Sequence, residues 1–143
     1  FLNRDVAQES TGCRGGPAQL IEATVALIRS ASPRGIVVLT LGEQGVLLVL
    51  PGRDAPVHVP GLPARVVDTT GAGDAFAGAF LAVWLNGGDV VEAARYGNAA
   101  GALIVSVEGA QGAIPTAASL AEMLGKAGSG LARAPRRGGL VSA

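Results

Sequence analysis

The sequence is poor in cysteine, histidine and lysine, with one of each in 143 residues, and each scarcity excludes a class of function. The single thiol, Cys13, permits no internal disulfide and is typical of a reducing compartment. The single imidazole, His58, excludes a histidine metal cluster and gives Cys/His catalysis almost no support. The single lysine, Lys126, lies in the C-terminal region, so no glycine-rich loop carries the lysine that a Walker-type phosphate loop requires.

The chain also lacks an excess of charge and a long hydrophobic run. Its formal net charge is zero, which gives no reason to expect nucleic acid or an anionic membrane as a partner. Hydrophobic residues make up 49% of the chain, yet no run approaches the roughly 20 residues of a membrane-spanning helix. The length suits one domain with its own core, and the start at Phe1 without methionine indicates part of a longer protein.

Hydrophobic periodicity predicts helices and strands that alternate along the chain. Apolar residues recur at helical spacing behind Pro17, with Thr24 as the one polar member of their stripe. A later stripe that includes Phe76, Phe80 and Trp84 predicts the buried face of another helix. The alternation predicts an α/β layered fold with a largely parallel sheet. We expect helices over 18–29, 75–85, 89–107 and 117–124, strands over 36–41, 46–50 and 57–59 (the last two as a hairpin), no regular element over 1–16, and a mobile tail from 125.

The most informative stretch is Asp68-Thr69-Thr70-Gly71-Ala72-Gly73-Asp74, which follows an apolar approach over residues 65–67 and opens a helix. Three small residues at the start of a helix let the backbone approach a ligand closely, and the first N–H groups have no intrahelical acceptor. Together with the helix dipole they form an anion site, most often for phosphate. A carboxylate beside that site, Asp74, is suited to accept a proton from the group that attacks the phosphate.

Two other interpretations of Gly71-Ala72-Gly73 stay open on these residues alone. A dinucleotide fingerprint requires a third glycine, but that position holds Phe76. A tight strand-to-helix turn without ligand is about as compatible with two glycines as a binding site is. Residues 42–45 and 71–73 are both expected behind the carboxyl ends of strands, where ligands of α/β sheets gather.

The flanks of this stretch add further patterns in a fixed order. Upstream, residues 40–45 read Thr-Leu-Gly-Glu-Gln-Gly, a Thr-x-Gly-x-x-Gly loop. Downstream, Asn98-Ala99-Ala100 is followed by Gly-Ala-Gln-Gly-Ala-Ile-Pro-Thr over residues 109–116. With residues 67–76, Val-Asp-Thr-Thr-Gly-Ala-Gly-Asp-Ala-Phe, these strings resemble the ribokinase (PfkB-type) carbohydrate kinases. Residues 2–12 resemble the segment where that family carries Asn-x-x-Glu, so the resemblance spans residues 1 to about 116.

The resemblance implies the C-terminal part of a three-layer, ribokinase-like α/β fold without its lid over residues 1–124, followed by a flexible Gly/Arg-rich tail over 125–143. It implies ATP-dependent phosphorylation of a sugar hydroxyl, with D-ribose and its product ribose 5-phosphate favoured. Asp74 is then the general base at the sugar, and the N–H groups of Gly71, Ala72 and Gly73 stabilise the moving phosphoryl group. Magnesium accompanies the ATP phosphates.

The resemblance also assigns contacts to individual residues. Nucleotide contacts fall on Asn3, Thr40, Leu41, Gly42, Glu43, Gln44, Gly45, Gly73, Asp74 and Asn98. Ligands of a monovalent cation, potassium, fall on Asp68, Thr70, Ile104, Val107, Gly109 and Ala113.

Two positions depart from the family pattern: the glutamate expected three residues after Asn3 is Val6, and a serine common before Ile-Pro is Ala113. The sugar-gripping residues and the lid belong upstream of Phe1, so we expect the 143-residue chain alone to bind nucleotide weakly and not to phosphorylate sugar. The implied partners are a small sugar and ATP, in the cytoplasm, and the full-length protein could form a homodimer. Fructokinase, another sugar or nucleoside kinase, a non-catalytic nucleotide-binding remnant and a dinucleotide-binding oxidoreductase module stay as alternatives.

Overall fold

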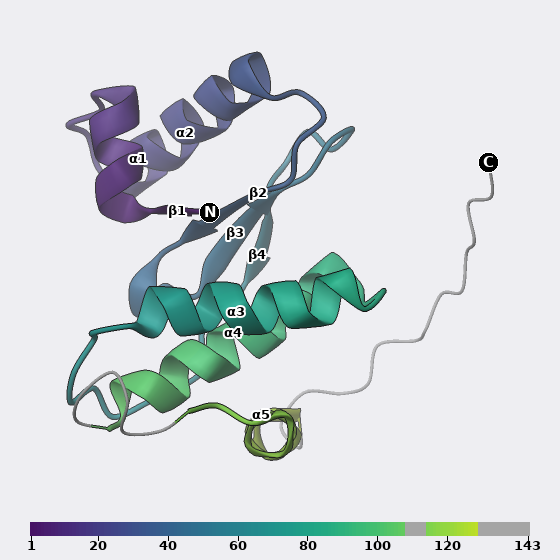
Figure 1. The fold of residues 1–143 in the computed structure, drawn as a ribbon. Helices are drawn as coiled ribbons and strands as arrows, with labels where there is room; N and C mark the ends of the chain where they lie inside the picture. The colour runs from purple at the N-terminus through teal and green to yellow at the C-terminus, as the bar shows by residue number, and fades with distance from the viewer. Residues whose placement is uncertain (108–113, 129–143) are drawn as a thin grey trace.

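The computed structural model describes residues 1–107 and 114–128. Its elements are β1 (Leu2–Asn3), α1 (Arg4–Thr11), α2 (Pro17–Ala31), β2 (Val37–Thr40), the 3₁₀ turn η1 (Gly42–Gln44), β3 (Val46–Val49), β4 (Val57–Val59), α3 (Ala72–Leu85), α4 (Val90–Val105) and α5 (Ala117–Gly128). The sheet lies between two helical layers, with α1 and α2 on one face and α3 and α4 on the other (Figure 1). The α/β layered class expected from the sequence is confirmed.

The four strands stand in the order β1-β2-β3-β4. Strand β1 runs parallel to β2, with Leu2 opposite Leu39, whereas β2–β3 and β3–β4 are antiparallel. The expected hairpin of β3 and β4 is confirmed, but in the described residues only one of three pairings is parallel, against the expected largely parallel sheet. The connections explain the difference, because residues 41–45 and 50–56 are too short for the crossover of about a dozen residues that a parallel pair needs.

Helix α1 was not expected from the sequence. Its residues are mostly polar, and Ala7 is its one buried residue, so it has almost no apolar stripe. Its ends are nevertheless well capped: the Asn3 side chain accepts the N–H of Val6 at 2.8 Å, and Gly12, at φ 65°, donates its N–H to the carbonyl of Gln8. These capping residues were the sequence signal for α1.

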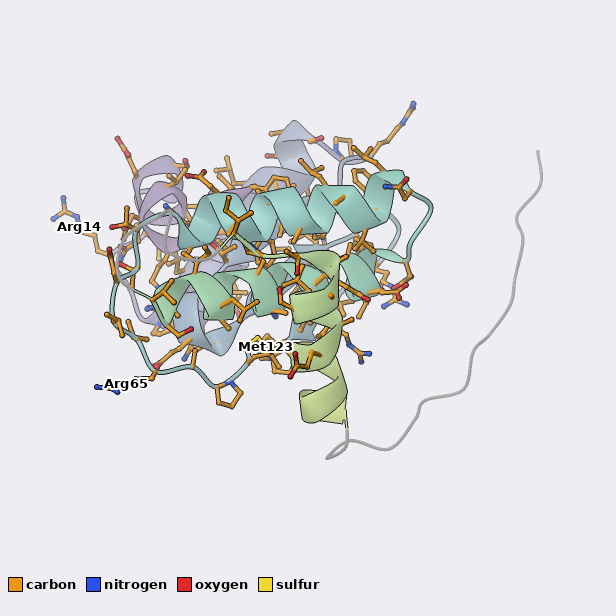
Figure 2. The ribbon with its side chains drawn as sticks, turned by 60° about the horizontal axis from the view of Figure 1, so that its bottom comes forward. Arg14, Arg65 and Met123 are labelled. Carbon is orange, nitrogen blue, oxygen red and sulfur yellow. The ribbon has the colours of Figure 1, made fainter. Side chains whose placement is uncertain are left out.

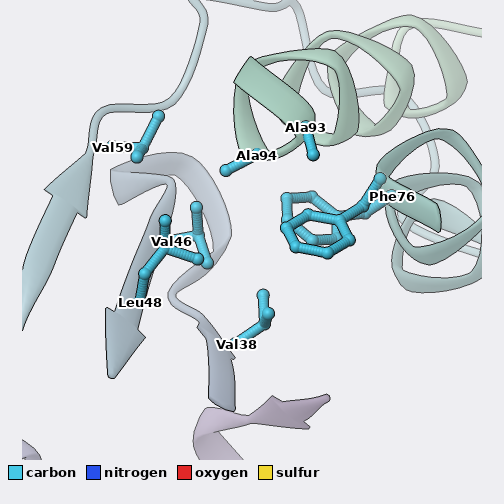
Figure 3. Packing of buried hydrophobic residues seen from close by; sticks show 8 residues of the cluster. Val38, Val46, Leu48, Val59, Phe76, Ala93 and Ala94 are labelled. Carbon is cyan, nitrogen blue, oxygen red and sulfur yellow. The ribbon is translucent and has the colours of Figure 1, made fainter. Parts of the chain in front are cut away.

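The main core lies between the sheet and the pair α3–α4 (Figure 3). Phe76 and Phe80 of α3 are buried against Val38, Val46 and other aliphatic side chains of the strands, as expected. Trp84 was expected in the same buried stripe, but it lies in the last turn of α3. There its ring meets that of Phe80, with centroids 6.1 Å apart, and 39% of its surface stays exposed.

The remaining helices agree with the expected signals. Pro17 opens α2, the Thr24 hydroxyl donates to the carbonyl of Leu20 at 2.7 Å, and Asp89 caps α4 by accepting the N–H groups of Val91 and Glu92. Helix α5 continues to Gly128, past the expected start of the tail at 125, and residues 129–143 lie outside the described part of the chain. Within that described part, none of the helices is long and apolar enough to span a membrane.

Helices α3 and α4 approach closely because Gly97 of α4 faces the ring of Phe76. A Cβ at Gly97 would lie 2.7 Å from Cε2 of Phe76, inside the contact distance of two carbon atoms. Replacement of Gly97 by alanine therefore forces the buried ring to move, although alanine itself favours the helix.

We predict that Gly97→Ala lowers the free energy of unfolding by about 1–2 kcal/mol, since overpacking outweighs the gain in helix propensity. Gly78→Ala is the matched control: Gly78 is also inside a helix, and a Cβ there meets nothing within 4 Å. This control should raise the free energy of unfolding by roughly 0.5–1 kcal/mol. Urea unfolding followed by circular dichroism measures both. Equal effects of the two substitutions would contradict the packing argument.

Candidate active site

A pocket of about 640 Å³ opens where the turn after β2, the segment after β4, the first turn of α3 and the middle of α4 meet. These four pieces come from distant parts of the sequence. The lining residues are Thr40, Gly42, Glu43, Gln44, Gly45, Gly61, Leu62, Pro63, Ala64, Val66, Thr69, Ala72, Gly73, Phe76, Asn98, Gly101, Ala102 and Val105. Most of the nucleotide contacts expected from the sequence are in this set, whereas Asn3, Leu41 and Asp74 are not.

The turn over residues 41–45 forms one wall. Gly42 and Gly45 adopt φ values of 64° and 89°, which side chains other than glycine rarely adopt. Two backbone hydrogen bonds close the turn. The N–H of Leu41 donates to the carbonyl of Gly45 at 2.8 Å, and the N–H of Gly45 donates to the carbonyl of Gly42 at 3.0 Å. Gln44 is held from outside, its carbonyl 2.8 Å from Nε2 of His58 and its Oε1 3.1 Å from Arg4.

The segment 60–66 forms a second wall. Its backbone contacts that of the turn where Gly61 meets Gly45. A Cβ on Gly45 would overlap the carbonyl oxygen of Val59 and the N–H nitrogen of Gly61, and a Cβ on Gly61 would overlap the carbonyl oxygen of Glu43. Both positions therefore need glycine. Sequence reasoning did not find Gly61, for which the one signal was a glycine between two prolines, Pro60 and Pro63.

Asn98 of α4 joins this wall to the helix. The residue is 9% exposed, and its Nδ2 donates to the carbonyl of Val59 at 3.2 Å and to that of Pro60 at 2.9 Å. The sequence assigned Asn98 to the nucleotide. In the structure Asn98 lines the pocket, and its amide nitrogen is hydrogen-bonded to the backbone at the end of β4 and just after it.

The first turn of α3 closes the pocket from the third side. Gly71 precedes the helix at φ 79°, and the N–H of Ala72 donates to the carbonyl of Thr69 at 3.2 Å, so one of the three donors expected for an anion already has a partner. The N–H of Gly73 belongs to the turn that has no intrahelical acceptor. Asp74 is exposed in the same turn, beside the residues that line the pocket.

The approach to this helix differs from the expectation. Residues 60–71 form neither strand nor helix, so the turn at 71–73 does not follow the end of a strand, as the turn at 42–45 does. Val66 and Val67 are 59% and 52% exposed, because no neighbouring strand covers them in the described residues. Backbone bonds fix the segment instead, with the N–H groups of Val67 and Asp68 donating to the carbonyl of Val105 at 2.7 and 3.3 Å.

These bonds bring together two groups of residues that the sequence assigned to a cation. Asp68 Oδ1 accepts the N–H of Thr70 at 2.9 Å, and the end of α4, where the Ile104 carbonyl accepts the N–H of Val107, lies alongside. Gly109 and Ala113 lie outside the described residues. Over 1–107 and 114–128, no three His, Cys, Asp or Glu side chains gather as a metal cluster, so a cation here would depend on backbone carbonyls with Asp68.

The pocket is nearly free of charged side chains. Among the lining residues in the described part of the chain, Glu43 is the one charged residue, and none is a lysine or an arginine. Arg65 lies in the wall segment 60–66, between Ala64 and Val66, but its side chain points away from the body of the molecule (Figure 2). An anion bound there would be stabilised by backbone N–H groups and the dipole of α3 rather than by side-chain cations.

Comparisons with known proteins agree with this geometry. Residues 1–117 match the model of the pfkB family carbohydrate kinases. The chain is 43% identical over 107 residues to an ATP-dependent ribose-1-phosphate kinase of Halopiger xanaduensis, which covers 75% of this chain and 35% of that protein.

Two solved structures share the fold. Ribokinase of Arabidopsis thaliana, complexed with ribose and ATP, has a TM-score of 0.76 at 33% identity over 85% of this chain and 39% of its own. Fructokinase of Vibrio cholerae O395, bound to fructose, ADP and calcium ion, has a TM-score of 0.71 at 30% identity, with the same coverage. The chain thus spans about two fifths or less of the length of these relatives. It has their ribokinase-like α/β fold and belongs to the pfkB family of carbohydrate kinases.

Proposed function

We propose that this chain is the ATP-binding and catalytic part of a kinase that transfers a phosphoryl group from ATP to a sugar hydroxyl. The observation that carries the proposal is the pocket itself. It brings the glycine turn at 42–45 and the first turn of α3 to one cavity, although they are separated by about 30 residues of sequence. The first binds the nucleotide, and the second receives its phosphates.

In the proposed reaction, Asp74 accepts the proton of the sugar hydroxyl, whose oxygen attacks the terminal phosphorus of ATP while the bond to ADP breaks. A carboxylate in the first turn of α3 is beside the helix end at which the phosphate charge is stabilised. The backbone N–H of Gly73 faces that charge, and Gly71 shapes the turn in front of it. Magnesium would accompany the ATP phosphates and neutralise part of their charge.

The proposed nucleotide contacts are residues 40–45, and Asn98 lines the same pocket. The proposed potassium site lies where Asp68 and Thr70 meet the end of α4. A site built from a carboxylate and backbone carbonyls suits a hard cation. Val6, exposed on α1, takes the position of the glutamate that the family carries, so the acidic side chain that would support magnesium is replaced there.

Ribose is the sugar that we propose first, because a ribokinase and a ribose-1-phosphate kinase are among the relatives; fructose is the alternative, from the fructokinase. The part of the relatives that this chain does not cover is expected to hold the sugar. Initial rates of the full-length protein with ribose, ribose 1-phosphate and fructose decide among them.

The catalytic proposal is tested in a chimera, with this chain in place of the matched 39% of Arabidopsis thaliana ribokinase. We expect the chimera, but not the chain alone, to phosphorylate ribose with ATP. Asp74→Asn in the chimera should lower kcat by roughly 10²–10⁴-fold, because it removes the base. It should leave ATP binding nearly unchanged, because Asp74, although the sequence assigned it to the nucleotide as well, is not among the residues that line the pocket. Asp54→Asn, at an exposed carboxylate in the turn after β3, is the control and should leave kcat unchanged.

Two outcomes contradict the proposal. One is a chimera that is folded and binds ATP yet transfers no phosphoryl group to any of the three sugars. The other is an Asp74→Asn variant with the rate of the parent.

Gly73→Ala separates the phosphate site from helix stability. A Cβ at Gly73 meets nothing within 4 Å, and its φ is not in the left-handed region, so the substitution should leave unfolding unchanged or slightly stabilise the helix. The added methyl group points into space that the phosphate needs, and we expect kcat/KM of the chimera to fall by about tenfold or more, which is at least about 1.4 kcal/mol. Gly78→Ala, further along α3 and not among the residues that line this pocket, should stabilise the helix in the same way and leave kcat/KM of the chimera unchanged. Full activity of Gly73→Ala would contradict the assignment of the phosphate site to this turn.

A further inference from the structure

We propose that Asn98 is a positioning residue, which sets the width of the pocket by holding the backbone of Val59 and Pro60. Through this backbone it fixes the wall at residues 60–64 against the turn at 42–45. The consequence for nucleotide binding rests on the proposed function, whereas the fixing of the wall does not.

The hydrogen bonds of Asn98 carry the inference. Its side-chain amide has two N–H groups, and Nδ2 donates to two carbonyls, those of Val59 and Pro60. Both partners are acceptors, so the nitrogen rather than the oxygen of the amide must face them. No donor is left for a ligand, and Oδ1 is the one polar atom of Asn98 that a nucleotide could contact.

The position of the wall depends on this bond because the sheet ends there. Val46 and Val59 form the last register pair of β3 and β4, and beyond it the chain turns across Gly45 at Gly61. The carbonyls of Val59 and Pro60 point toward α4, where Asn98 is their donor. Without it they would have to turn toward water, and the wall would move with them.

A second contact holds the wall independently of Asn98, so that the effect of Asn98 on the wall can be measured in a chain that stays folded. Leu62 packs against the cluster of Ala99, Ala100 and Leu120, which joins α4 to α5. The wall therefore retains an apolar contact when Asn98 is changed, and the chain is expected to stay folded.

The first test follows the wall in the unliganded chain by NMR. In Asn98→Ala, the heteronuclear NOE of the Gly61, Leu62 and Ala64 amides should fall, which reports faster motion on the ps–ns timescale. Asn86→Ala is the matched control, because Asn86 Nδ2 also donates to a backbone carbonyl, that of Ala82 at 2.7 Å, but at the far end of α3. A wall whose NOE values are equal in the parent and in Asn98→Ala overturns the proposal.

The second test measures the affinity of the chain for ATP and for purine riboside triphosphate, which lacks the 6-amino donor of adenine. If Asn98 acts through the wall, Asn98→Ala weakens both ligands by the same factor, about tenfold. Asn98→Asp should be as weak or weaker, because it keeps an acceptor oxygen but loses the donor and faces two carbonyls with a negative charge. The opposite pattern, with ATP affinity retained in Asn98→Asp and the loss in Asn98→Ala confined to ATP, assigns Asn98 to direct contact and overturns the proposal. If the parent chain binds neither ligand, the proposed function fails for this chain, while the NMR result still decides the role of Asn98.

Discussion

The close approach of two backbone segments, at Gly45 and Gly61, is the constraint on which the pocket depends. Each segment occupies the volume that a Cβ of the other would need, so neither can carry a side chain there. The approach brings the turn after β2 to the segment after β4, and Asn98 then holds that segment from the helical layer. Gly97, one residue before Asn98, applies the same principle to the packing of α4 on Phe76. The absence of a side chain at Gly45, Gly61 and Gly97 thus allows the close packing of both the pocket walls and the core next to them.

The scarcity of charged side chains among the described lining residues also determines the electrostatics of the pocket. The pocket is lined by glycines, alanines, larger apolar residues such as Leu62 and Phe76, and a few polar residues, with Glu43 as its one charged side chain among the described lining residues. It offers an anion backbone N–H groups and the end of a helix. Backbone donors are fixed by the fold, so they need no side-chain ordering when an anion arrives. The catalytic role that we propose for Asp74 is compatible with this arrangement, because the proposed phosphate site does not depend on a neighbouring lysine or arginine that the carboxylate would neutralise.

Much of the fold could be predicted from local pattern. Strong apolar periodicity gave the bounds of α2, α3 and α4 to within a few residues, and the turn chemistry around Gly52 gave the hairpin of β3 and β4. Helix α1 was missed because it rests on its caps at Asn3 and Gly12 rather than on an apolar face. The site residues were predicted from a motif. A motif cannot show that both side-chain N–H groups of Asn98 donate to the carbonyls of Val59 and Pro60. Nor can it report that Gly61 meets Gly45, since both facts arise from contacts between segments distant in sequence.

Strand β1 carries a consequence for the order in which the chain folds. Its partner β2 lies 37 positions further along, with α1 and α2 in between, whereas β2, β3 and β4, like α3 and α4, are joined to their partners by short turns. Closing a long loop costs more conformational entropy than closing a short one, so the hairpins and the helical pair can nucleate without the N-terminus. Strand β1 therefore joins the sheet late, after these local elements have formed. On this view, the segment that bears the pocket forms first and then binds the strand through which any further part of the sheet would be attached.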